Sequence, residues 1–176
     1  MFVDEIKLSV HSGAGGSGSV SFKKTSSKSS PSGGSGGQGG SVIITVNEEL
    51  NDLSHIISNS SLKAENGTDG NKNFQNGKKG KDLIIEVPKG TKIKVENEVY
   101  ADLHENKSSF IVLEGSKAGR GNYDLISKRV PNPQFCEHGE KRNKIEIKLT
   151  YSIYSDLVIV GLPNAGKSTL ITKLTN

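Results

Sequence analysis

The residues from Gly161 to Ser168 have the types and the spacing needed to hold the phosphates of a nucleotide. They fit the pattern G-x-x-x-x-G-K-[ST] of a phosphate-binding loop. In such a loop Gly161 and Gly166 permit backbone conformations that a Cβ would block, so that N–H groups point at phosphate oxygens. We expect Lys167 to supply positive charge to the phosphates and the Ser168 hydroxyl to be a ligand of Mg²⁺.

The elements on either side of this loop are those that the chemistry requires. The apolar run 156–160 predicts a buried strand, and the spacing of Leu170, Ile171 and Leu174 predicts a helix that begins at Lys167. A helix N-terminus adds unpaired N–H groups to the anion site. The alternative, a glycine-bounded turn that matches the pattern by chance, leaves these flanks unexplained. The predicted phosphate site comprises Gly161, Leu162, Pro163, Asn164, Ala165, Gly166, Lys167, Ser168 and Thr169.

Composition predicts a small core and a large share of irregular backbone. Hydrophobic residues make up 32% of the 176 residues, and 21 residues are glycine. Cys136 is the only cysteine, so no disulfide can form within the chain, which favours a reducing cytoplasm. Residues 1–6 lack the basic region and the apolar stretch of a secretory signal, and we expect neither that signal nor a membrane span.

The net charge of +4 comes with clustered cations. Such clusters favour an anionic partner such as RNA, but they also occur on ordinary solvated surfaces, and charge alone does not decide between the two. Few aromatic residues neighbour them in sequence, so base stacking is not indicated. The clusters are Lys23, Lys24 and Lys28; Lys78, Lys79 and Lys81; Lys128 with Arg129; and Lys141, Arg142 and Lys144.

Alternating apolar residues predict that the part before the loop is mainly β. A short helix is expected at 48–57, where leucines and isoleucines share a helical spacing. A turn is expected at 88–91, and a hairpin turn at 96–97. The predicted strands span 6–10, 41–46, 82–87, 93–95, 99–103, 110–113 and 145–149.

Glycine-rich excursions separate these strands, at 11–18, 25–40, 66–80 and 115–122. Composition alone favours flexible linkers. The alternative is that they pack together as extended, polyproline-like helices in which only glycine fits at close backbone contacts.

Several segments in order along the chain resemble the Obg (CgtA) family of bacterial GTPases. The resemblance covers essentially the whole sequence. The matching segments are Gly13-Ala14-Gly15-Gly16-Ser17-Gly18, residues 33–42, 76–83 and 87–91, Gly119-Arg120-Gly121-Asn122, and residues 161–170.

The resemblance implies a mainly β fold with a bundle of glycine-rich left-handed (polyproline II-like) helices and a small β-barrel. Residues 1–155 would form this glycine-rich domain. Residues 156–176 would be the first strand, phosphate loop and helix of an α/β GTPase domain. In that case the excursions are ordered and are not linkers.

The resemblance also implies a cytoplasmic GTPase that acts in the assembly of the large ribosomal subunit, with ribosomal RNA and not DNA as partner. Residues 161–169 would hold GTP or GDP, Ser168 would ligate Mg²⁺, and Lys167 would neutralise phosphate charge during hydrolysis. The catalytic residues that position water belong to segments of the family that lie beyond Asn176. Alternatives are a ribosome-binding module without catalysis, a vestigial truncated product, and an ATPase or kinase. Because residues 1–176 do not include those family segments, we expect weak or no GTP binding by residues 1–176 alone.

The sequence departs from the family at serines that replace glycine or aspartate, including Ser12, Ser17 and Ser32. A side chain with a Cβ is harder to fit at a crowded helix axis.

Overall fold

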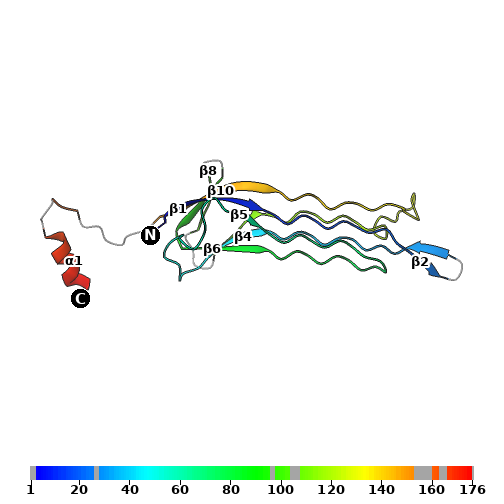
Figure 1. The fold of residues 1–176 in the computed structure, drawn as a ribbon, viewed down its shortest axis with the longest axis horizontal. Helices are drawn as coiled ribbons and strands as arrows, with labels where there is room; N and C mark the ends of the chain where they lie inside the picture. Colours follow the sequence, from blue (N-terminus) through cyan, green and yellow to red (C-terminus); the bar gives the residue numbers. More distant parts are fainter. Residues whose placement is uncertain are drawn as a thin grey trace.

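The computed structural model describes residues 3–25, 28–95, 98–103, 108–152, 160–162 and 166–175. Strands gather at one end of the part before the loop, and extended segments run side by side from there to the hairpin at the other end (Figure 1). The elements are β1 (Glu5–His11), β2 (Phe22–Thr25), β3 (Lys28–Pro31), β4 (Val42–Val46), β5 (Ser61–Lys63), β6 (Leu83–Val87), β7 (Thr91–Val95), β8 (Glu98–Leu103), β9 (Ser109–Leu113), β10 (Lys144–Tyr151) and α1 (Lys167–Thr175).

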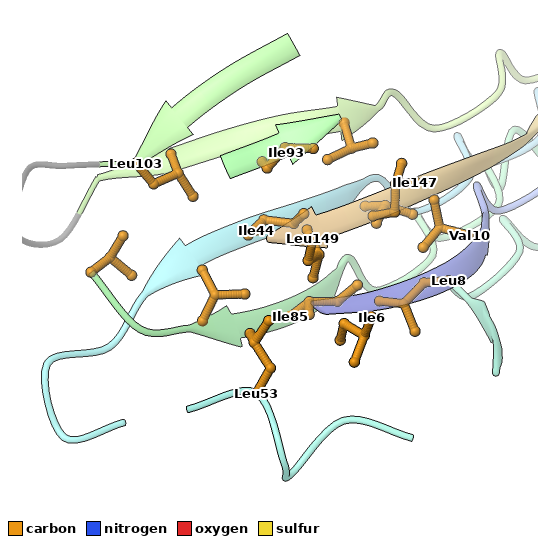
Figure 2. Close-up of a cluster of buried hydrophobic side chains, with 14 of the residues drawn as sticks. Ile6, Leu8, Val10, Ile44, Leu53, Ile85, Ile93, Leu103, Ile147 and Leu149 are labelled. Atoms are coloured by element: carbon orange, nitrogen blue, oxygen red, sulfur yellow. The ribbon is translucent and has the colours of Figure 1, made fainter. Parts of the chain in front are cut away.

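Two sheets share one hydrophobic core. The order of the larger sheet is β5-β1-β10-β7-β8 and that of the smaller is β6-β4-β9, while β2 and β3 form a separate hairpin. Successive side chains of a strand point to opposite faces, so each strand sends alternate residues inward. Ile6, Leu8 and Val10 of β1 meet Ile44 of β4 and Leu149 of β10 in this core (Figure 2).

Every strand predicted before residue 150 has a counterpart, but β2, β3 and β5 were not predicted. The helix expected at 48–57 is wrong, because this segment forms a series of turns. Side-chain oxygens of Asn47 and Asp52 accept hydrogen bonds from the backbone N–H groups of Glu49 and Ser54. Such local bonds compete with the helical pattern and favour turns.

The glycine-rich excursions are not flexible linkers, because backbone hydrogen bonds join them to one another. In the first pair of segments the N–H groups of Gly13, Gly16 and Ser19 donate to the carbonyls of Gly40, Gly37 and Gly34, at 2.9, 2.9 and 3.0 Å. Every third residue therefore faces the neighbouring segment. We call the whole assembly the bundle; its segments are 12–21, 32–41, 64–72, 75–82, 114–122 and 134–143.

Glycine is required in the bundle by close approach of backbones. A Cβ added to Gly39 would lie 2.0 Å from the carbonyl oxygen of Gly13, and one added to Gly115 would lie 1.8 Å from that of Gly39. Two of the substituted serines, Ser12 and Ser32, are accommodated in the bundle as buried residues. The Ser12 hydroxyl accepts a 3.0 Å hydrogen bond from the Asn143 N–H, so it replaces a backbone partner.

Candidate nucleotide-binding loop and basic tip

Gly166 ends the loop and begins the helix. Its φ is +76°, a left-handed conformation, and among the described residues no atom of another part of the chain lies within 4 Å of an added Cβ. Glycine is needed here for its backbone angle rather than for space, unlike the bundle glycines. The carbonyl of Gly166 accepts a 3.0 Å hydrogen bond from the Leu170 N–H, so α1 starts immediately after it. The first N–H groups of α1 are therefore available to an anion.

Lys167 folds back over the start of the loop. Its Nζ donates to the carbonyl oxygens of Gly161 at 2.9 Å and Leu162 at 2.6 Å, and its side chain is half-buried. These bonds hold the ammonium group against the two carbonyls that begin the loop, while Lys167 itself is the first residue of α1. A lysine ammonium and the free N–H groups of a helix N-terminus are the kinds of group that bind phosphate.

Ser168 and Thr169 lie exposed in the first turn of α1. The bond from the Thr172 hydroxyl at 2.9 Å goes to the Ser168 carbonyl, not to its side chain. Mg²⁺ at nucleotide sites takes one or two protein oxygens together with phosphates and waters. An exposed hydroxyl next to the loop lysine fits this requirement, so Ser168 would hold the ion.

Three predicted loop residues, Pro163, Asn164 and Ala165, lie outside the described residues, as does most of the strand predicted at 156–160. Val160 and Leu162 are described and are not in a strand; their exposed fractions are 89% and 80%. The structure therefore brings together Gly161, Leu162 and Lys167, with Gly166, Ser168 and Thr169 alongside in the chain.

The far end of the bundle combines cations with exposed aromatic rings, which sequence proximity did not indicate. We call the β2–β3 hairpin together with residues 72–74 and 123–130 the tip. Phe74 and Tyr123 meet edge to face, with ring centroids 4.8 Å apart. Both are tied by backbone bonds to the same segment, at Ser32 and Gly33.

Phe22 also lies at the tip, because it pairs with Pro31 in the β2–β3 hairpin. Between 41% and 49% of each of the three aromatic residues is exposed. The sequence did not predict this group of aromatic residues, because residues 22, 74 and 123 are distant in sequence and only the fold brings them to the tip. The predicted lysine clusters do not all lie at the tip. The cluster of Lys23, Lys24 and Lys28 lies on the β2–β3 hairpin and that of Lys128 and Arg129 also lies at the tip, whereas Lys144 lies at the opposite end, on β10.

Two further sets of polar contacts stabilise the bundle, and the spacing of their residues in the sequence does not predict them. The Arg120 guanidinium donates two hydrogen bonds to the Glu137 carboxylate, at 2.8 and 2.6 Å, and these bonds hold the pKa of Glu137 at about 2. Asn122 is fully buried and accepts a 2.8 Å bond from the Gly33 N–H. Its amide donates to the carbonyls of Ser21 and Pro133.

The fold and the loop together define a class of protein in which a glycine-rich β unit precedes a phosphate loop. Comparison with known families makes this specific. A model of the GTP1/OBG family matches residues 3–153, and a model described as a 50S ribosome-binding GTPase matches residues 156–176. The chain belongs to the GTP1/OBG family.

Curated relatives agree with this assignment. GTPase Obg of Nautilia profundicola is 43% identical over 100% of this chain and 50% of its own length. GTPase Obg of Finegoldia magna is 40% identical over 100% of the chain and 43% of its own length, and that of Borreliella afzelii is 40% identical over 99% and 55%. The chain spans about half the length of the curated relatives it matches. Within the described residues, α1 is too short and too polar to cross a membrane.

Proposed function

We propose that this chain is the front part of a GTP-binding protein that hydrolyses GTP and acts in assembly of the large ribosomal subunit in the cytoplasm. The observation that carries the proposal is the contact of Lys167 Nζ with the carbonyls of Gly161 and Leu162, directly before the N-terminus of α1. The names of the curated relatives support guanine nucleotide as the ligand.

In this proposal residues 161–169 bind the phosphates of GTP or GDP. The backbone N–H groups of the loop and of the first turn of α1 donate to phosphate oxygens, and Lys167 moves its ammonium from the loop carbonyls onto the phosphates. Bound Mg²⁺, with Ser168 as a ligand, supplies further positive charge to the phosphate oxygens. The contribution of Lys167 to hydrolysis is to stabilise the charge that develops on the transferred phosphoryl group.

The partner that we propose is ribosomal RNA of the large subunit, contacted at the tip. The exposed rings of Phe74 and Tyr123 offer stacking surfaces, and Lys23, Lys24 and Lys28 on the hairpin offer charge for phosphates. The description of the matching family model, a 50S ribosome-binding GTPase, supports this partner. The tip also supports the second candidate, a ribosome-binding module without catalysis.

We also infer that the chain divides into a glycine-rich domain at 1–155 and the beginning of an α/β GTPase domain at 156–176. The boundary is supported by the two family matches, which meet between 153 and 156. The bundle segments are inferred to be left-handed, polyproline II-like helices. Contacts that recur every third residue support this, since that helix has three residues per turn.

The test is nucleotide binding by the full-length protein, measured by isothermal titration calorimetry. We expect GTP and GDP to bind in the presence of Mg²⁺, and Lys167→Ala to weaken binding at least tenfold. The matched control is Lys173→Ala, which removes a lysine from the last turn of the same helix. Equal effects of the two substitutions, or equal affinity for ATP, would contradict the proposal.

A further inference from the structure

Three lysines stand side by side on the outer face of the larger sheet. Lys7 of β1 pairs in register with Lys148 of β10, and Lys148 pairs in register with Lys94 of β7. The neighbouring residues Leu8, Ile147 and Ile93 point into the core, so the three lysines share the opposite face. Like charges directly opposite one another destabilise a sheet, so this row requires an explanation.

The carboxylates of this face neutralise the row only in part. Glu5 lies 2.7 Å from Lys148 Nζ, and this bond, with the nearby charges of Lys148, Lys7 and Lys94, lowers the pKa of Glu5. Neither Lys7 nor Lys94 has an ion pair with any residue that the structure describes. The other lysines of these strands have acids of their own: Lys92 pairs with Asp102, and Lys144 with Glu146.

The row lines a hollow of about 450 Å³ on the surface of the sheet. Its polar lining comes from Lys7, Ser9, Asn59, Lys94, Glu146 and Lys148. Asn59 has a φ of +58°, and its N–H donates a 2.7 Å bond to the carbonyl of Lys7, which fixes the turn before β5 at the edge of the hollow. The volume lies in the range of sites for small ligands.

We propose that this hollow is a binding site for phosphate groups. The ammonium groups of Lys7, Lys94 and Lys148 supply the charge, and the Ser9 hydroxyl and Asn59 amide supply neutral donors. Glu146 also lines the hollow but pairs with Lys144, and Glu5 is the carboxylate that competes with the ligand for Lys148. The site lies among the strands, at the other end of the bundle from the tip (Figure 1), and does not depend on the phosphate loop.

Two sources could provide the phosphates: the backbone of RNA or a free polyphosphate such as a nucleotide. Both present closely spaced anionic oxygens to the three lysines, and they differ in length. A continuous RNA backbone would run across the strands and beyond the hollow, whereas a free polyphosphate would fill it. Sodium tripolyphosphate and a short RNA duplex are therefore the two probes.

The experiment uses the full-length protein carrying Lys167→Ala, so that phosphate binding by the loop is weakened. Each probe is titrated while the amide signals of Ser9 and Asn59 are followed by NMR, which separates this hollow from the tip. We expect at least one probe to shift both signals saturably. A response to RNA alone assigns the site to RNA backbone, and a response to tripolyphosphate alone assigns it to a free polyphosphate.

The variant that tests the lysines is Lys7→Thr with Lys94→Thr. Threonine suits strands, and the substitutions relieve charge repulsion, so folding should not suffer. We expect binding to weaken about tenfold or more, and the slope of log affinity against log salt for RNA to fall by about two. Glu5→Gln should strengthen binding. The matched control is Lys63→Thr, on β5 of the same sheet but outside the hollow.

The proposal is overturned if neither probe shifts the Ser9 and Asn59 signals. It is also overturned if the double variant binds as tightly as its parent, or if Lys63→Thr weakens binding as much as the double variant does.

Discussion

Replacing Gly39 by alanine tests whether the bundle packs as closely as described. The new Cβ would lie 2.0 Å from the Gly13 carbonyl oxygen, 2.4 Å from the Gly13 carbonyl carbon and 2.9 Å from the Ala14 carbonyl oxygen, so all three close contacts are with backbone. An ordinary contact needs at least 3.4 Å, and the two segments must therefore separate by about 1.4 Å. No side-chain rotation can relieve the clash.

The separation acts on hydrogen bonds as well as on packing. The bonds from the N–H groups of Gly13 and Gly16 to the carbonyls of Gly40 and Gly37 are each 2.9 Å, and a shift of this size stretches both beyond bonding distance. Two unsatisfied buried pairs and the overpacking together cost about 3 to 6 kcal/mol. This is a large part of the roughly 5 to 15 kcal/mol that stabilises a domain.

The measurement is urea unfolding of the Gly39→Ala variant, followed by circular dichroism. Ala14→Ser is the control, because Ala14 is half-buried in the adjacent segment and its Cβ is already accommodated. We expect the control to unfold within about 0.5 kcal/mol of the parent. If Gly39→Ala also stays within 1 kcal/mol of the parent (a small effect by the same standard), the reasoning from backbone contact is refuted.

Three further predictions concern single side chains or backbone angles. Asn122→Ala leaves the buried Gly33 N–H and Pro133 carbonyl without their side-chain partner, whereas the Ser21 carbonyl keeps its bond from the Ser32 N–H; the free energy of unfolding should fall by about 2 to 4 kcal/mol in urea titrations. Glu137 has its pKa lowered from 4.5 to about 2 by Arg120, so its stabilisation is present above pH 4.5 and is lost as the pH falls towards 2. The melting temperature of Glu137→Gln should depend less on pH in that window, and an unchanged pH profile would count against the ion pair. Gly166→Ala forces an alanine into a left-handed conformation at about 1–2 kcal/mol, and should weaken nucleotide binding roughly tenfold without changing the melting temperature of the bundle.

Local periodicity was enough to predict the strands that build the core. β1 and β10 alternate apolar and polar residues, because one buried face imposes that period on the sequence, whereas β4 is a short, mostly apolar run. The three-residue strand β5 is too short for a period, and β2 and β3 consist mostly of serine and lysine outside the core. These strands are set by tertiary pairing, which a single sequence does not display.

The bundle and the surface sites depend on contacts between distant residues. Composition favoured linkers because glycine and serine carry no hydrophobic pattern, although the three-residue spacing of Gly33, Gly36 and Gly39 is visible in the sequence. The meeting of Phe74 with Tyr123 depends on segment order, and so does the lysine row on the sheet. The loop motif at 161–168 is visible in the sequence because its residues are contiguous, but phosphate binding by it stays a prediction; the described part of α1 begins at Lys167.

Nucleotide-dependent association of the full-length protein with large ribosomal subunits tests the central proposal most directly. In co-sedimentation we expect the protein to pellet with large subunits in the presence of a non-hydrolysable GTP analogue and to a lesser extent with GDP. Lys167→Ala should abolish the difference between the nucleotides, and Lys24→Ala with Phe74→Ala at the tip should reduce pelleting with both. Co-sedimentation that is the same with GTP analogue, with GDP and in all variants would contradict the account.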